Sequence, residues 1–328
     1  MSSRPQEDRA GSTGPVESRI TNHESRFSRG WVAGFVLCAA FAGDPSAADF
    51  TFAALGDMPY SQDEEARFPS LIAEMGRENL AFVVHVGDFK RATETCSDEI
   101  FLERRGWFEA SPHPFIYVPG DNEWTDCRRP FGAARDPYER LGKLRELFFA
   151  EEASFGQRKL RLTRQPGLAG GPRHPEHARW EHQGVLFLTL NAPGYNNHQT
   201  GPEFAARNAA VRQWLTGSFA GARARGLRGV VVLMHGDAWD SAGHTRSGFT
   251  GLVETLAAET RAFDGAVLLV HGDSHRYRVN QPLRDPATGA PLANFLRVMV
   301  FGSPSQRWVR IRVTEEGGKI RFEATPGD

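Results

Sequence analysis

Short runs of apolar, β-branched and aromatic residues recur along the chain, and polar residues follow many of them abruptly. A run of about four to eight such residues bounded by turn residues predicts a buried strand. The runs that lead into Asp or His residues cover 50–55, 80–86, 115–118, 229–234 and 266–270. Further strands are predicted at 184–190, 298–301, 308–313 and 320–323.

The intervening segments carry apolar residues at helical spacing. Ser61 can cap a helix over residues 61–79, in which Phe68 and Leu71 fall on one side. Further helices are predicted at 97–108, 136–148, 202–225 and 249–263. No linker or long repeat interrupts this alternation, so residues 49–328 are predicted to form one α/β domain.

One stretch lacks either pattern. Residues 165–181 are rich in Gly, Pro and His and predict a long loop. The histidines in and after it, His174, His177 and His182, have a spacing that fits no compact metal site. We therefore expect these three side chains to lie at the surface.

The N-terminal segment, residues 1–48, differs in composition from the rest. Its first part is polar and poor in aromatic residues, which predicts disorder. Arg26 and Arg29 then precede an apolar block at 31–42, and small residues follow at 46–48. This order is typical of a cleaved signal peptide, and the block is shorter than the roughly 20 residues of a transmembrane helix. We expect a periplasmic or secreted protein with no stable membrane span after cleavage; an uncleaved N-terminal anchor is the alternative.

Removal of a signal peptide would leave two cysteines, Cys96 and Cys127. Each follows shortly after a Gly-Asp pair at a strand end, so their loops should share one rim of the sheet. An oxidising compartment permits a disulfide, and we predict that Cys96 and Cys127 form one. Two free thiols in a reducing cytosol are the alternative.

Acidic and imidazole side chains follow the predicted strands. Asp57, Asp88 and Asp121 each follow a glycine at a strand end, and His235 and His275 follow two later strands. Carboxylates gathered at one sheet edge repel one another, and cations make such an arrangement stable. Carboxylate and imidazole ligands together predict two divalent metal ions, with Mn, Fe, Mg and Zn as candidates. Two such ions can clamp and attack a phosphoryl group, which predicts a phosphoester hydrolase.

The order of these motifs resembles that of the calcineurin-like metallophosphoesterases. The resemblance covers nearly the whole chain after the N-terminal segment, and the apolar strand that ends in His235 is especially similar to the purple acid phosphatase branch. It implies a four-layer α/β/β/α sandwich with two metals at the strand ends. The segments that carry it are Gly56-Asp57, Gly87-Asp88, Gly120-Asp121-Asn122-Glu123, Val231-Val232-Leu233-Met234-His235 and Gly272-Asp273-Ser274-His275.

The resemblance also implies roles for individual residues. Asp57 would bind the first metal, and His275 would complete that site. Asp88 would bridge the two metals, and His235 would bind the second. These four residues match the family pattern at their own positions.

Other positions depart from the family pattern. Asp121 stands where the family has Asn, and Asp273 stands where it has His, and either could still be a metal ligand. Pro59 replaces the histidine of the first motif and cannot coordinate. Arg91 occupies the position of the tyrosine ligand of purple acid phosphatases, which leaves Tyr60 as a candidate substitute. The added carboxylates favour Mn, Mg or Fe over Zn.

Asn122 replaces the histidine that helps to protonate the leaving group in the family. An amide can orient phosphate by hydrogen bonds, but it cannot act as a general acid at neutral pH. Asp237 and His244 are candidates for the missing acid. Lys90 and Arg91 follow the bridging Asp, and they are either phosphate contacts or a surface pair.

Four further polar positions need an interpretation. Asn196 and Asn197 lie in the polar loop predicted at 194–198 and are candidates for substrate contact. His85, inside a predicted strand, is expected to be a core histidine. His271, one residue before a glycine, is expected to be a core or supporting residue.

The net charge is −1 over 328 residues, so charge alone implies neither a nucleic-acid partner nor a membrane surface. We expect an exported metal-dependent phosphoesterase that acts on the mono- or diesters of a small phosphorylated substrate. A metal-bound hydroxide would attack phosphorus while Asp57 and Asp88 hold the metals and Asn122 steadies the substrate. The alternative is a non-catalytic member of the same fold that binds a metal or a surface.

Overall fold

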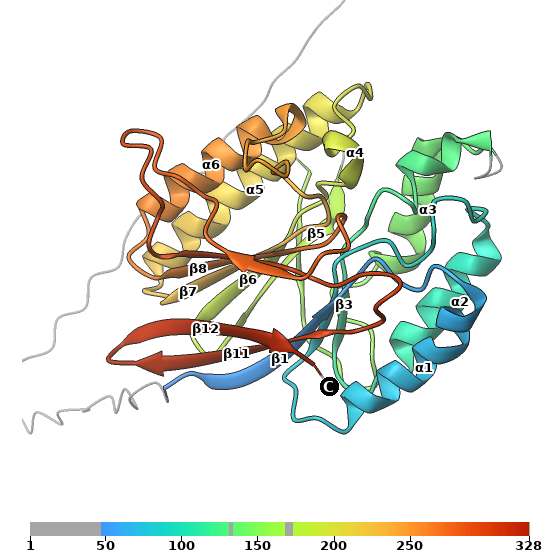
Figure 1. The fold of residues 1–328 in the computed structure, drawn as a ribbon, viewed down its shortest axis with the longest axis horizontal. Coiled ribbons are helices and arrows are strands. Elements are labelled where there is room, and N and C mark those ends of the chain that lie inside the picture. Colours follow the sequence, from blue (N-terminus) through green and yellow to red (C-terminus); the bar gives the residue numbers. More distant parts are fainter. Residues whose placement is uncertain (1–46, 131–133, 168–172, 328) are drawn as a thin grey trace, which may run out of the picture. The chain divides into compact units, whose positions relative to one another are not determined.

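The computed structural model describes residues 47–130, 134–167 and 173–327, and these residues form two β-sheets with helices outside each (Figure 1). The first sheet has the strand order β12-β11-β1-β2-β3. In it β1, β2 and β3 are parallel, and the β11–β12 hairpin is antiparallel to β1. The strands are β1 Asp49–Leu55, β2 Val83–His85, β3 Phe115–Tyr117, β11 Val309–Glu316 and β12 Lys319–Pro326.

The second sheet has the order β4-β5-β6-β7-β8-β10-β9. Its central strands β6, β7, β8 and β10 are parallel, and β4, β5 and β9 add antiparallel edges. The strands are β4 Thr163–Gln165, β5 His174–His182, β6 Val185–Thr189, β7 Gly229–Leu233, β8 Ala266–His271, β9 Arg278–Asn280 and β10 Phe295–Met299.

The long helices begin where capping residues predict. Ser61 accepts a hydrogen bond from the backbone of Glu64, Ser97 accepts one from Ile100, and Asp136 caps the third helix, which has proline at its first position. The helices are α1 Gln62–Gly76, α2 Asp98–Glu109, α3 Pro137–Phe148, α4 Gly194–Asn197, α5 Phe204–Ala224 and α6 Thr250–Arg261, with short 3₁₀ turns η1 Thr125–Arg128 and η3 Ser247–Phe249.

Three apolar layers hold the sandwich together. Phe52 and Val84 of the first sheet meet Phe187 and Val231 of the second in the central layer. Alternate residues of β1–β3 pack outward against α1, α2 and α3. Alternate residues of β6–β8 pack outward against α5 and α6. The predicted four-layer α/β/β/α arrangement is therefore confirmed (Figure 1).

The loop predicted at 165–181 is wrong, because β4 and β5 occupy its two ends. The prediction of surface histidines also fails at His174 and His177, which are buried with parallel rings 5.4 Å apart; His182 is half-buried. Strand β5 buries polar side chains that bond to one another, so it lacks the apolar pattern of a strand. Within the described residues, His177 Nε2 has no hydrogen-bond partner. We call Arg145, Gln165, His174, Glu176 and His177 the β5 polar cluster.

The parallel strands of both sheets end toward the same edge, which gathers their following loops there. Across the parts of the chain described here, no helix is long and apolar enough to cross a membrane. The predicted disordered segment and signal peptide fall almost entirely on residues 1–46, outside the described residues.

Candidate metal centre

Six side chains from five strand ends meet at the shared edge. Three of them follow the parallel strands of the first sheet, and three follow β7 and β8 of the second. Four have left-handed backbone, with φ of 56° at Asp57, 59° at Asp88, 74° at Asp273 and 52° at His275. Such backbone is costly for non-glycine residues and gathers at functional sites. We call the six residues the metal centre: Asp57, Asp88, Asp121, His235, Asp273 and His275.

His235 lies in the middle of the carboxylates. Its Nε2 is 2.9 Å from Asp121 Oδ1, 3.4 Å from Asp88 Oδ1 and 4.0 Å from Asp57 Oδ1. Its Nδ1 lies 2.8 Å from the carbonyl oxygen of Val86, so the neutral ring places its proton there. Nε2 is buried and makes no hydrogen bond with the geometry of an N–H donor. In the neutral ring the Nε2 lone pair has no donor and faces carboxylates, which is the arrangement of a metal ligand.

Two overlapping groups could each hold an ion. Asp57, Asp88 and His235 offer ligand atoms within 4.8 Å of one another, and so do Asp121, His235 and Asp273. His275 extends the first group, because its Nε2 lies 3.5 Å from Asp57 Oδ1. Its Nδ1 lies 2.9 Å from the carbonyl oxygen of Ser303, which again leaves Nε2 free. The donor set of carboxylate and imidazole fits divalent transition metals.

Glycines bring the backbone against these carboxylates. A Cβ at Gly120 would lie 2.0 Å from Asp88 Oδ1. A Cβ at Gly194 would lie 2.5 Å from Asp121 Oδ1 and 2.4 Å from Asp273 Oδ1. No side chain fits at either position, so the carboxylates can approach only glycine backbone.

The charges of the metal centre are not balanced by the protein itself. Burial raises the pKa of Asp57, and it raises the pKa of Asp88 well above its usual value. Burial also raises the pKa of Asp273 to about 6. Burial opposes the charge of His235, yet the carboxylates of Asp88, Asp121 and Asp57 raise its pKa well above the usual range. Bound cations would stabilise the ionised carboxylates that the protein alone disfavours.

Asn122 is engaged within the protein. Its backbone N–H donates to Asp88 Oδ1 at 3.0 Å, and its side-chain amide donates to Tyr60 Oη at 2.9 Å and to the carbonyl of Lys90 at 3.0 Å. Tyr60 in turn donates to Asp88 Oδ2 at 2.8 Å. Asn122 and Tyr60 therefore fix the orientation of Asp88. The role of Asn122 in contacting phosphate stays a prediction.

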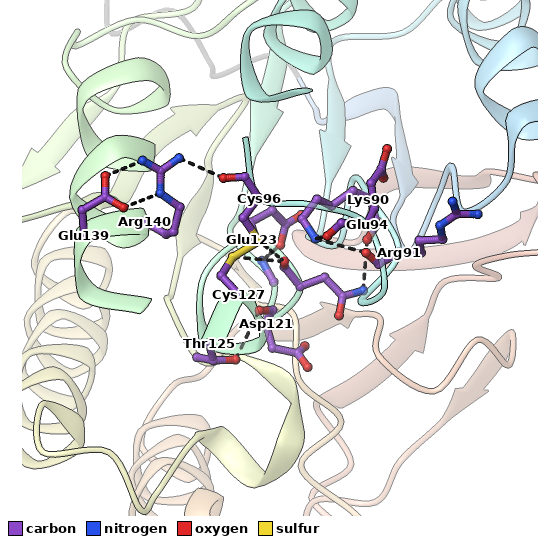
Figure 2. Close-up of a disulfide and its surroundings, with 12 residues drawn as sticks. Lys90, Arg91, Glu94, Cys96, Asp121, Glu123, Thr125, Cys127, Glu139 and Arg140 are labelled. Atoms are coloured by element: carbon purple, nitrogen blue, oxygen red, sulfur yellow. Dashed lines mark hydrogen bonds and ion pairs between the residues drawn. A yellow bond between two sulfur atoms is a disulfide. The ribbon is translucent and has the colours of Figure 1, made fainter. Parts of the chain in front are cut away.

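A disulfide lies directly behind Asn122, as predicted. Cys96 and Cys127 are joined, with Cα atoms 5.7 Å apart, and their sulfurs lie 3.6 and 3.7 Å from the carbonyl oxygen of Asn122 (Figure 2). Lys90 is buried beside them, and its ammonium donates to the carbonyls of Arg91 and Glu94. Lys90 is thus neither a surface residue nor free to bind phosphate; it closes the loop that the disulfide holds.

Of the other residues singled out in the sequence, some lie beneath the metal centre or in the core and one lies at the surface. Asp237 accepts from Ser274 Oγ at 2.8 Å and lies 3.3 Å from Arg297 Nη1, and its backbone N–H donates to Asp273. The side chain of His244 is 81% exposed and pairs only weakly with its neighbour Asp240, at 3.4 Å. His271 is buried beneath the strand end beside Asp237, as expected of a supporting residue. His85 is buried with Nε2 3.0 Å from the carbonyl of Met58, which confirms a core histidine.

The predicted loop at 194–198 is a short left-handed turn, labelled α4 in Figure 1. Asn196 and Asn197 use their side chains to bind Ser247 and Gly248 of η3. Neither is directed to a substrate by these contacts. Sequence reasoning missed the turn, because a Tyr at its start is an unusual residue for left-handed backbone.

A hollow of about 1280 Å³ lies elsewhere, between the starts of β7, β8 and β10 and the β11–β12 hairpin. Its lining includes Leu227, Ala266, Phe295 and Phe322. Leu227, Ala266 and Phe295 lie at the amino ends of parallel strands and Phe322 lies in the hairpin, whereas the metal centre lies at the carboxyl ends of the parallel strands. The hollow is therefore separate from the chemistry described above.

No family model matches the chain, and no curated protein matches its sequence. Solved structures do match: PhoD has a TM-score of 0.50 at 13% identity, over 81% of this chain and 64% of that chain. A dimetal phosphatase from Danio rerio has a TM-score of 0.49 at 11% identity, over 84% of this chain and 98% of that one. A purple acid phosphatase from yellow lupin (Lupinus luteus) seeds has 0.47 at 12%, over 85% and 52%. The likeness to PhoD shows that the two chains share a fold.

Proposed function

We propose that this protein is a metal-dependent phosphoesterase that hydrolyses phosphate mono- or diesters at a site for two divalent ions. One observation carries the proposal: the buried, unpartnered Nε2 of His235 faces three carboxylates at 2.9 to 4.0 Å. Such a gathering costs free energy unless cations occupy it. The motif order and the fold both agree with phosphoester chemistry at this place.

The residues divide into two groups around the shared histidine. When bound, the ions supply Lewis acidity toward a phosphoryl oxygen and lower the pKa of water. Asp57 and His275 would hold one ion, and Asp121 and Asp273 would hold the other with His235. Asp88 lies between the groups, 3.4 Å from His235, and would contact both ions.

Asn122 and Tyr60 act through Asp88 in this proposal. Their hydrogen bonds occupy both Asp88 oxygens, at 3.0 and 2.8 Å, and so hold the carboxylate in one rotamer. A carboxylate shared by two ions needs this restraint, because small displacements at a reacting centre cost large factors in rate. The proposal also includes a contact between Asn122 and the phosphate. In the substrate complex the Asn122 amide would donate to the phosphate in place of Tyr60 Oη or the carbonyl of Lys90.

The test is a panel of metals and substrates. Protein freed of metal by chelation is reloaded with Mn²⁺, Fe²⁺, Mg²⁺ or Zn²⁺ and assayed with an aryl phosphate monoester and the matching diester. We expect hydrolysis that requires added metal and stops on chelation. Elemental analysis of protein purified without chelator should find about two ions per chain. Metal binding with no hydrolysis of either ester would instead support a non-catalytic member of the fold.

We also propose that the protein is exported to the periplasm or secreted. The Cys96–Cys127 disulfide supports this proposal, because such bonds persist in oxidising compartments. Expression of the full chain, cell fractionation and N-terminal sequencing test it. We expect the exported form to begin near residue 49, and a chain that stays reduced in the cytosol would contradict the proposal.

A further inference from the structure

The turn Gly194–His198 presents side chains on an unusual backbone. Tyr195, Asn196, Asn197 and His198 all have positive φ, of 47°, 56°, 56° and 45°. Left-handed backbone crowds the Cβ of every residue except glycine, and Asn tolerates it better than most. Asn and His are among the residue types enriched in this region, so Asn196, Asn197 and His198 suit the turn, whereas Tyr195 does not.

Other contacts hold the turn in place. Arg207, which is buried, donates to Asn197 Oδ1 at 2.6 Å and to its carbonyl oxygen at 2.9 Å. Asn196 Oδ1 accepts from the backbone of Gly248 at 2.9 Å, where a Cβ would lie 2.0 Å from the carbonyl oxygen of Asn196. The surrounding structure imposes the backbone, so the identity of its one unsuited residue, Tyr195, needs a separate reason.

His198 is also fixed by burial, whereas Tyr195 is not buried. His198 is 2% exposed, and its ring lies 5.8 Å from that of Trp124. Tyr195 is 60% exposed, so burial does not account for an aromatic residue there. A large aromatic side chain on unfavourable backbone and open to solvent indicates a task outside the folded core.

The position of Tyr195 connects it to the metal centre. It follows Gly194, whose N–H donates to Asp121 Oδ1 at 3.2 Å. The guanidinium of Arg129 lies 5.3 Å from the Tyr195 ring centroid. Arg129 is itself tied to this rim by an ion pair with Asp126 at 3.1 Å, and the backbone of Asp126 donates to the carbonyl of Asp121. The backbone before Tyr195 and the residue paired with Arg129 thus both contact the same candidate ligand, Asp121.

We propose that Tyr195 and Arg129 form the subsite for the leaving group of the phosphoester and that this group is planar and aromatic. The inference rests on the proposed function and names its substrate class. A planar π-system stacks on a tyrosine ring or a guanidinium plane, and this contact tolerates many ring types. Aryl phosphates and nucleotides share this chemistry, whereas an alkyl phosphate gains little from it.

The experiment measures binding, so that it stands apart from hydrolysis. Phosphonates carry a P–C bond in place of the ester bond, and a phosphoesterase does not cleave it. Titration calorimetry of the Mn²⁺-loaded full chain compares methylphosphonate, 1-naphthylmethylphosphonate and the 5′-phosphonate isostere of adenosine monophosphate. The variants are Tyr195→Phe, which keeps the ring, Tyr195→Asn, which suits the backbone, and Leu102→Ala, a control at a residue 51% exposed on α2.

We expect the wild type, Tyr195→Phe and Leu102→Ala to bind at least one aromatic phosphonate about tenfold more tightly than methylphosphonate. Tyr195→Asn should lose this preference, keep its affinity for methylphosphonate and melt at the same or a higher temperature, since Asn suits left-handed backbone. The isostere and the naphthyl compound distinguish a nucleotide from a simple aryl substrate.

Equal binding of all three phosphonates by the wild type would overturn the subsite. So would a Tyr195→Asn variant that keeps the aromatic preference. If the preference is present but no aryl ester is hydrolysed under any metal, the proposed activity fails and the subsite stands.

Discussion

The metal centre and the β5 polar cluster both bury acids and histidines, yet they differ in how those groups are partnered. In the β5 polar cluster, Glu176 accepts from Arg145 Nη2 at 2.6 Å and from Asn191 at 3.1 Å. Burial opposes the charge of Glu176, but His174 and Arg145 hold its pKa well below the usual value. In the metal centre no arginine or lysine pairs with the buried carboxylates among the described residues, and the pKa of Asp88 rises.

This difference separates a structural polar cluster from a site. A buried acid that has its cation is complete, and it stabilises the fold without a ligand. Buried acids that face only the imidazoles of His235 and His275 are incomplete, and cations from solution would complete them. Burial and residue type alone do not distinguish the two regions, because both contain His and Asp or Glu. The partners do.

The largest expected effect is the loss of activity from Asp88→Asn. The substitution removes the charge that would lie between both ions and keeps the shape of the side chain. We expect metal-dependent hydrolysis of an aryl phosphate to fall by about 10³-fold or more, a loss of about 4 kcal/mol in transition-state stabilisation. Steady-state kinetics measure it, and Asp264→Asn, at an exposed residue before β8, is the matched control.

The same variant should also show that the metal centre is incomplete without ions. In metal-free protein, Asp88→Asn removes one of several crowded carboxylates, so we expect stability to rise, on the order of 1 kcal/mol. Mn²⁺ at about 100 times its dissociation constant should stabilise the wild type by about 2.7 kcal/mol and the variant less. If Mn²⁺ does not change the melting temperature of the wild type, the metal centre is not incomplete without ions, and the contrast with the β5 polar cluster is wrong.

The opposite sign is expected in the β5 polar cluster. Glu176→Gln leaves the charge of Arg145, a side chain 26% exposed, without its partner. We expect the free energy of unfolding to fall by about 3 kcal/mol, at the lower end of the range for a broken buried pair, because Arg145 keeps some solvent. Urea unfolding in the presence of chelator measures it. The double variant Arg145→Met with Glu176→Met should recover most of the loss, since apolar pairs of similar volume replace buried ion pairs well.

The metal centre and the β5 polar cluster also differ in how well the sequence predicts them. The gathering of the metal centre's side chains was predictable, because each candidate ligand comes after a clear apolar strand and the four aspartates directly follow a glycine, as at Gly87-Asp88 and Gly272-Asp273. Strand β5 was not predictable from its own pattern, because its buried positions are His and Glu. Their partners, Arg145 and Gln165, come from α3 and β4, and only tertiary structure brings them together.

The helices were predictable from caps and spacing, and their bounds moved by only a few residues. The hydrogen bonds around Asp88 were harder to predict from the sequence. Tyr60 was a candidate from its place after Pro59, but its bond to Asn122 depends on a loop crossing between β1 and β3. The left-handed turn before α5 had no sequence signal beyond its paired asparagines, because η3 and Arg207 impose it from far along the chain.

The Cys96–Cys127 disulfide is expected to affect both the stability of the fold and the metal centre. It closes a span of 31 residues and lies against Asn122. We expect Cys96→Ser with Cys127→Ser to lower the free energy of unfolding by about 2–4 kcal/mol, mainly through the entropy of the unfolded chain. Activity should fall as well, because Asn122 and Asp88 lose their support. As a control, the reduced wild type should have the same free energy of unfolding in urea as the double variant. Full activity in the double variant would show that the disulfide does not position the metal centre.

A further expected effect is a change in pH dependence within the β5 polar cluster. Burial lowers the pKa of His177 from 6.5 to about 3. Between these values the unfolded chain binds a proton that the folded chain does not, so the free energy of unfolding falls as the pH falls. His177→Gln should flatten this slope by up to about 1.4 kcal/mol per pH unit near pH 5. Urea unfolding from about pH 6.5 to about pH 5 measures it, and His244→Gln, whose side chain is 81% exposed, should leave the slope unchanged. An unchanged slope in His177→Gln would mean that this histidine is not held neutral by burial.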